Sequence, residues 1–140
     1  MNEKVKWIFL FVILAVGVFG YTYFMMYWSD VALPIIEYIK PNNQFITSTL
    51  LILLNALGIG VLGFLLVLPI NYLFGHKGYI ASFGVAAAIA VWNVMVWFMY
   101  IPKMPNYITI IEWVSIIIAF PVMSIICFKI PIIRNSLKSA

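Results

Sequence analysis

Three asparagines and one glutamate lie within the long apolar stretches of the chain: Asn55, Asn71, Asn93 and Glu112. If those stretches cross a lipid bilayer, each such residue costs free energy unless it meets a partner or water, which makes it a candidate for function or for helix packing. Glu112 is the one ionisable residue of the four. Buried between helices, it could bind a proton or balance a cation. Because it lies only five residues after Tyr107, it could equally extend to the outer surface, and the sequence leaves both alternatives open.

Small residues at helical spacing form a second pattern. One stripe is made of Ser82, Ala86, Ala90, Asn93 and Trp97, and a similar one of Ala56, Gly60 and Gly63. Small side chains allow close approach of another helix, and an amide on such a stripe can bond across the interface. We therefore interpret Asn93 as a packing residue in preference to a ligand contact. The two helices that carry these stripes are predicted to pack tightly together.

The remaining chemistry of the chain is sparse. The sequence has one cysteine, Cys127, and one histidine, His76, which cannot supply the four ligands of a structural zinc site. Members of a Ser/His/Asp relay would have to come from opposite sides of a membrane. The net charge of +4 is spread along predicted helix ends and forms no basic patch. We therefore predict no catalytic residues, metal site, cofactor or nucleic-acid partner, and we do not expect an enzyme.

The elements that position these residues follow from composition. Of 140 residues, 66% are hydrophobic and 9% are charged, which no soluble core could accommodate. The apolar runs cover residues 7–28, 45–74, 79–101 and 107–128, and Glu112 is their one charged residue. About 20 helical residues cross a hydrocarbon core. We predict an all-α polytopic membrane protein, with residues 1–140 forming a single domain of four transmembrane helices in an antiparallel bundle.

The flanking charges predict an orientation. On one side of the membrane the predicted spans place Lys4, Lys6, Lys77, Lys129, Arg134 and Lys138, and on the other side they place Lys40 and Lys103. By the positive-inside rule, both termini face the cytoplasm. The first run is too long for the apolar region of a signal peptide and has no small-residue cleavage site after it, so we interpret it as a retained span.

Prolines mark the connections and bends. Residues 29–44 are predicted to be an ordered, lipid-facing outer loop, favoured over a binding lid, with Pro34 and Pro41 limiting any helix there. Pro69 and Pro121 lie inside the second and fourth runs, each eight residues before a lysine. This correspondence suggests two helical hairpins related by duplication as parallel repeats, an alternative that the sequence leaves open.

Several segments resemble the GtrA-like family of small four-helix membrane proteins. The similar features are Val-Gly-Val-Phe at 16–19, Pro105 before the fourth run, Asn-Tyr-Leu-Phe at 71–74 and Phe-Lys-Ile-Pro-Ile-Ile-Arg at 128–134. The resemblance implies a protein of the bacterial inner membrane that helps to move polyprenyl-phosphate-linked sugars across it. Lys77, Lys129 and Arg134 would then bind a lipid phosphate at the cytoplasmic surface. Taken singly, each of these cations is explained by topology alone.

The competing hypothesis is an interaction protein. Four helices, short connections and many large apolar side chains would also suit an accessory subunit of a membrane complex, or an immunity protein that blocks a pore-forming toxin. Expected partners are therefore membrane lipids together with either a second copy of the chain or another membrane protein.

Overall fold

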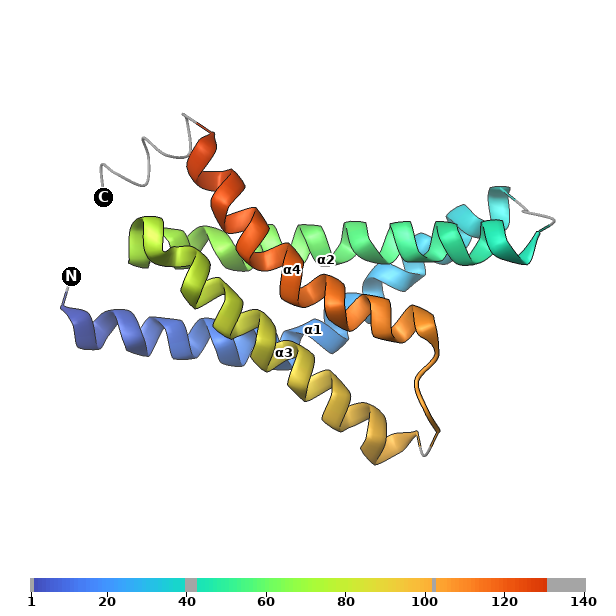
Figure 1. Cartoon of the computed structure of the whole chain (residues 1–140), viewed down its shortest axis with the longest axis horizontal. Coiled ribbons are helices and arrows are strands. Elements are labelled where there is room, and N and C mark those ends of the chain that lie inside the picture. The colour runs from blue at the N-terminus through green and yellow to red at the C-terminus, as the bar shows by residue number, and fades with distance from the viewer. Residues whose placement is uncertain (1, 40–42, 102, 131–140) are drawn as a thin grey trace.

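The computed structural model describes residues 2–39, 43–101 and 103–130, and these residues form helices with no β-strand. Lys40, Pro41, Arg134 and Lys138, which carried sequence predictions, lie outside the described residues. The elements follow in the order α1 (Glu3–Ile39), α2 (Gln44–Phe74), the 3-10 turn η1 (Gly75–Lys77), α3 (Gly78–Tyr100) and α4 (Tyr107–Lys129). In Figure 1 the start of α1, the η1 turn and the end of α4 all lie on the left side of the molecule.

Three stretches of the described residues are long and apolar enough to cross a membrane: Glu3–Ile39, Gln44–Tyr100 and Tyr107–Lys129. The middle stretch contains α2, η1 and α3 in succession. Large apolar side chains such as Phe11, Met99 and Phe45 are more than two-thirds exposed along these helices, as expected where lipid tails replace water. The chain is therefore an all-helical, multi-pass membrane protein.

The first helix corrects the prediction of an outer loop at residues 29–44. Instead of ending at Trp28, α1 continues through Pro34 to Ile39. A proline removes only one backbone donor from the helix ladder, and packing can compensate for that loss. Here Ala32 is buried, and the Trp28 indole Nε1 donates a hydrogen bond to the Leu54 carbonyl oxygen at 2.8 Å. Contact with α2 thus supports the second half of α1.

Local capping contacts stabilise both ends of α2 and the start of α4. The Asn43 side chain accepts a hydrogen bond from the Phe45 amide at the start of α2, and the Asn106 side chain accepts one from the Thr109 amide at the start of α4. At the end of α2, Gly75 has a φ of 60°, which glycine adopts without a Cβ penalty, and its amide donates to the Asn71 carbonyl. These caps satisfy backbone groups that a helix end leaves unpaired.

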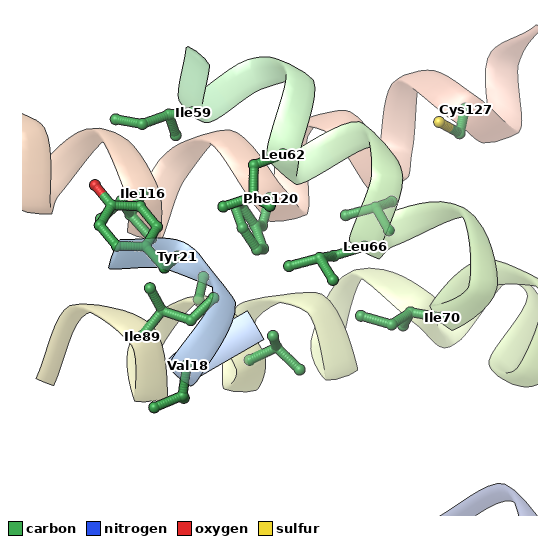
Figure 2. Packing of buried hydrophobic residues seen from close by; sticks show 13 residues of the cluster. Val18, Tyr21, Ile59, Leu62, Leu66, Ile70, Ile89, Ile116, Phe120 and Cys127 are labelled. Atoms are coloured by element: carbon green, nitrogen blue, oxygen red, sulfur yellow. The ribbon is translucent and has the colours of Figure 1, made fainter. Parts of the chain in front are cut away.

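The core lies where all four α-helices cross, as Figure 2 shows. Each helix contributes: Val18 and Tyr21 from α1; Ile59, Leu62, Leu66, Val67 and Ile70 from α2; Val85, Ala86 and Ile89 from α3; and Ile116, Phe120 and Cys127 from α4. In a bilayer, close packing provides the attraction between such helices, because lipid tails are as apolar as the core itself.

The helices α2 and α3 are in contact, but the small residues of α2 face α1 and α4 instead of the stripe on α3. A Cβ on Gly63 would lie 3.1 Å from the Phe120 ring, and one on Gly58 would lie 2.7 Å from the Trp28 indole. The stripe in the sequence marks Gly63 as a place of close approach. It does not say which neighbour approaches, because that depends on how each helix is rotated.

Candidate functional site

Asn71 is fully buried and links α2 to α4. Its Nδ2 donates to the Ser124 carbonyl oxygen at 3.1 Å, and the Ser124 hydroxyl donates to Asn71 Oδ1 at 2.5 Å. Both polar groups are therefore satisfied inside the bundle, where an unpaired amide would be costly. Of the four polar residues singled out from the sequence, Asn71 is the one whose side chain bonds to another helix through two hydrogen bonds.

The same asparagine supports the turn between α2 and α3. Its carbonyl accepts from the Gly75 amide, and its side chain fills the space beside Gly78 so closely that a Cβ at Gly78 would overlap it. Asn71, Gly75 and Gly78 thus fix the path of η1. The turn leaves His76 and Lys77 exposed.

Lys77 lies at the edge of an apolar groove between α1 and α3, which we call the α1/α3 groove. Its volume is about 420 Å³, and it is lined by Trp7, Leu10, Leu14, Phe74, Lys77, Ile80, Ala81, Gly84 and Val85. Trp7 and Phe74 make an edge-to-face contact with ring centroids 5.7 Å apart. Lys77 is the one charged side chain among these lining residues, so the groove combines an apolar floor with a cation.

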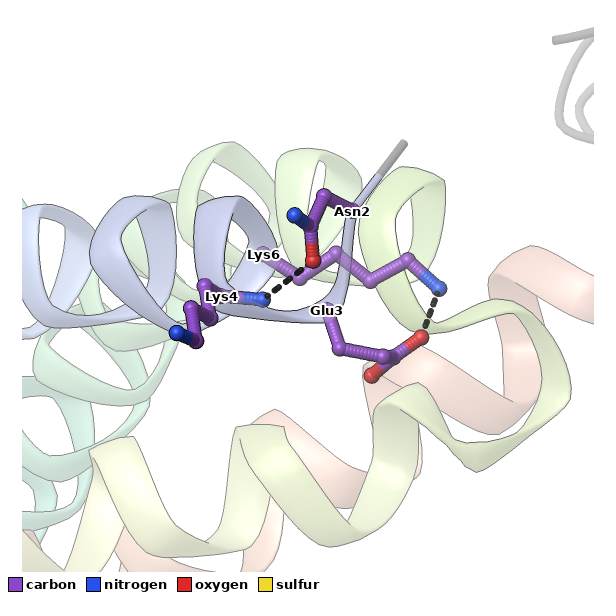
Figure 3. A network of polar contacts seen from close by, with 4 residues as sticks. All are labelled: Asn2, Glu3, Lys4 and Lys6. Atoms are coloured by element: carbon purple, nitrogen blue, oxygen red, sulfur yellow. Dashed lines mark hydrogen bonds and ion pairs between the residues drawn. The ribbon is translucent and has the colours of Figure 1, made fainter.

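The other predicted phosphate ligands are not part of this groove as the structure describes it. Lys129 is exposed at the last residue of α4 and does not line the groove, and Arg134 lies outside the described residues. Lys4 and Lys6 lie at the start of α1, where the Lys6 ammonium pairs with the Glu3 carboxylate at 2.8 Å (Figure 3). That exposed pair, formed within one helical turn, contributes little to stability.

Glu112 is oriented into the bundle. Its Oε1 accepts a hydrogen bond of 2.5 Å from the Tyr21 hydroxyl, and Tyr21 is only 2% exposed. The Glu112 carboxylate therefore does not extend to the outer surface, which was the other alternative that the sequence left open. Nothing in the sequence singles out Tyr21, since a tyrosine within an apolar run is equally compatible with a lipid-facing position.

The two remaining asparagines differ from each other. Asn93 donates to the Ile89 carbonyl of its own helix at 2.8 Å, so its amide does not form the predicted bond across an interface. Asn55 lines a small cavity between α2 and α4, together with Glu112 and Ser115. Among the stripe residues near Asn93, Ser82 is buried and its hydroxyl has no hydrogen-bond partner among the described residues.

Residues 2–39, 43–101 and 103–130 contain no group of three or more His, Cys, Asp or Glu side chains placed to hold a metal ion. No protein-family model matches the chain, and neither a curated protein nor a solved structure matches it. The functional argument therefore depends on the α1/α3 groove and on the polar contacts around Glu112.

Proposed function

We propose that the chain binds a polyprenyl phosphate in the α1/α3 groove and assists the movement of polyprenyl-phosphate-linked sugars across the membrane. The observation that carries this proposal is Lys77 beside an otherwise apolar groove that includes Trp7, Phe74 and Gly84. An isoprenoid chain suits the apolar lining, and a phosphate suits an ammonium group near the headgroup region. Two of its lining residues, Trp7 and Ile80, are more than half exposed, so a lipid chain can reach the groove.

The proposed topology is consistent with this role. We propose that α2 and α3 cross the membrane separately, so that α1 to α4 form an antiparallel four-helix bundle with both termini in the cytoplasm. The exposed cations Lys77 and Lys129 then lie on the cytoplasmic side, and Lys103 lies outside. The resemblance to the GtrA-like family supports the same function and a location in the bacterial inner membrane.

Binding of a polyprenyl monophosphate to the protein in nanodiscs, measured by native mass spectrometry, tests the first step. Lys77→Gln should weaken binding of the phosphate lipid by about tenfold or more, since a charge-assisted contact contributes about 1.5–3 kcal/mol. Lys103→Gln removes the same charge at the opposite end of α3 and should leave binding unchanged. A neutral polyprenol should bind the wild-type protein more weakly than the phosphate and should not distinguish the two variants.

A second variant tests the groove itself. Gly84 lies on the groove lining and has open space around it, so Gly84→Leu should fit without disturbing the bundle and should occlude the lipid chain. Equal binding of the phosphate lipid by wild type, Lys77→Gln and Gly84→Leu would contradict the proposal. Binding of the lipid without accelerated transfer of a lipid-linked sugar across the proteoliposome membrane is a further outcome. That result would support the binding site and contradict the transport role.

A second function is favoured by a different surface. The exposed face of α2 carries an apolar groove of about 690 Å³, lined by Leu53, Ala56, Leu57, Gly60, Val61, Phe64 and Leu65 with Met123 of α4. Small residues flanked by large apolar ones suit a transmembrane helix of another protein. Under this alternative the chain is an accessory subunit or a toxin immunity protein. It should then co-purify with a membrane partner, Gly60→Leu should release that partner, and Lys77→Gln should not.

A further inference from the structure

Glu112 lies in an apolar helix and has no basic partner among the described residues. Among the described residues the only ion pair joins Lys6 to Glu3, at the start of α1. Glu112 has the Tyr21 hydroxyl as its hydrogen-bond donor, and a hydroxyl carries no charge to balance a carboxylate. A carboxylate within a membrane span is costly unless another charge accompanies it. A cation bound beside the carboxylate would supply that charge.

The cavity beside Glu112 is suited to a single small ion. It lies between α2 and α4 and has a volume of about 10 Å³, which is room for about one water-sized particle. Its polar lining residues are Asn55, Glu112 and Ser115, and the rest of the lining is aliphatic. The Ser115 hydroxyl donates its proton to the Ile111 carbonyl at 2.7 Å, so its oxygen keeps lone pairs for another contact.

We propose that this cavity is a binding site for one monovalent cation of the size of Na⁺. Tyr21 bonds to one oxygen of the Glu112 carboxylate, which leaves the second oxygen as the charged ligand. The Asn55 carbonyl and the Ser115 hydroxyl supply neutral oxygen ligands of the kind that hard cations prefer. One carboxylate balances one positive charge, whereas protein sites for Ca²⁺ or Mg²⁺ usually contain more acidic ligands.

This site is separate from the proposed lipid site. The α1/α3 groove involves η1, the adjoining parts of α1 and α3, and Phe74 at the end of α2. The cation cavity instead involves the first half of α2 and the first half of α4. No residue is shared between the two linings. Binding of a cation and binding of a lipid phosphate can therefore be measured independently, and failure of one leaves the other standing.

Carbodiimide labelling tests the proposal. Dicyclohexylcarbodiimide modifies carboxyl groups in apolar surroundings, and mass spectrometry of the labelled protein locates the modified residue. The labelling is compared in Na⁺ and in choline at constant pH and ionic strength. We expect Na⁺ to slow modification of Glu112 by about tenfold when the Na⁺ concentration is about ten times the dissociation constant of Na⁺. Glu112→Gln should remove the label and thereby verify its position.

Matched amide substitutions separate the cavity from general effects. Asn55→Leu removes a proposed ligand and should abolish protection by Na⁺, while Glu112 is still modified. Asn93→Leu makes the same change at an amide bonded within its own helix and should retain protection. Na⁺ should also raise the Tm of wild type and Asn93→Leu, and should not raise that of Asn55→Leu. Equal modification rates in Na⁺ and choline, including no modification in either, would overturn the proposal.

Discussion

Asn71 and Ser124 are joined by hydrogen bonds in both directions, with the amide donating to the serine backbone and the serine hydroxyl donating to the amide oxygen. Both residues are almost completely buried, at 0% and 1% exposure. The pair connects α2 to α4 at the level of the turn that presents Lys77. This pair of residues therefore helps to hold the turn, and with it Lys77, the proposed phosphate ligand, in place.

Replacing Asn71 with leucine should destabilise the protein by about 1–3 kcal/mol, because the buried Ser124 hydroxyl and carbonyl lose their partner. The Tm in detergent, followed by size-exclusion chromatography after heating, measures the effect. Asn93→Leu is a matched control, since the Asn93 amide donates only within its own helix. An Asn71→Leu protein as stable as wild type would show that this link contributes nothing to the fold.

Gly58 should tolerate no side chain. A Cβ at this position would lie 2.7 Å from the Trp28 indole, so Gly58→Ala must displace the ring and weaken its bond to the Leu54 carbonyl. We expect a loss of about 1–3 kcal/mol, comparable with other overpacked sites. Gly84→Ala, with no atom within 4 Å of the new Cβ, should be neutral or slightly stabilising. The ratio of folded to aggregated protein on heating distinguishes the two variants, and similar behaviour of both would contradict the described contact.

Removing the Tyr21 hydroxyl should be costly because Glu112 loses its donor. For Tyr21→Phe we expect a lower Tm, corresponding to about 1.5–3 kcal/mol for a hydrogen bond to a charged group. Tyr23→Phe makes the same change at a side chain that is 67% exposed on the same helix, and it should have no effect. If both phenylalanine variants have the same Tm as wild type, the Tyr21–Glu112 hydrogen bond does not stabilise the protein.

Cysteine accessibility checks the extension of α1. Tyr38 is 89% exposed and Ala32 is 2% exposed, so Tyr38→Cys should react with a membrane-impermeant maleimide and Ala32→Cys should react at least tenfold more slowly. The one native cysteine, Cys127, is buried and should give little background. A loop at residues 29–39 would instead make both positions reactive. Labelling of Tyr38→Cys from outside intact cells would also support the proposed orientation.

The helical membrane architecture is predictable from the sequence because a bilayer requires long, uninterrupted apolar segments. The predicted limits of the second, third and fourth runs differ by no more than a residue from the limits of α2, α3 and α4. The extension of α1 was not predictable in the same way. Pro34 and the mixture of polar and apolar residues around it indicate a loop locally, whereas the contact of Trp28 with α2 is a tertiary effect.

Much less of the candidate site follows from the sequence. Asn71 and Glu112 stand out by their polarity, but their partners Ser124 and Tyr21 depend on the rotation of α4 and α1 about their axes. The position of Glu112 near the helix end likewise left the direction of its side chain open, because the rotation of α4 does not follow from the sequence. Lys77 was predicted as a phosphate ligand, whereas the groove beside it depends on residues far apart in the chain, such as Trp7 and Gly84.

The unequal helix lengths have a consequence for the surrounding lipid. At about 1.5 Å per residue, the 37 residues of α1 extend over about 55 Å, whereas the 23 residues of α3 and of α4 extend over about 34 Å. A hydrocarbon core of about 30 Å matches the shorter helices, so α1 must tilt, extend into the headgroups or thicken the bilayer beside it. The protein therefore presents an uneven hydrophobic height around its circumference. Acyl-chain length should shift its tilt, and with it the width of the groove between α1 and α3.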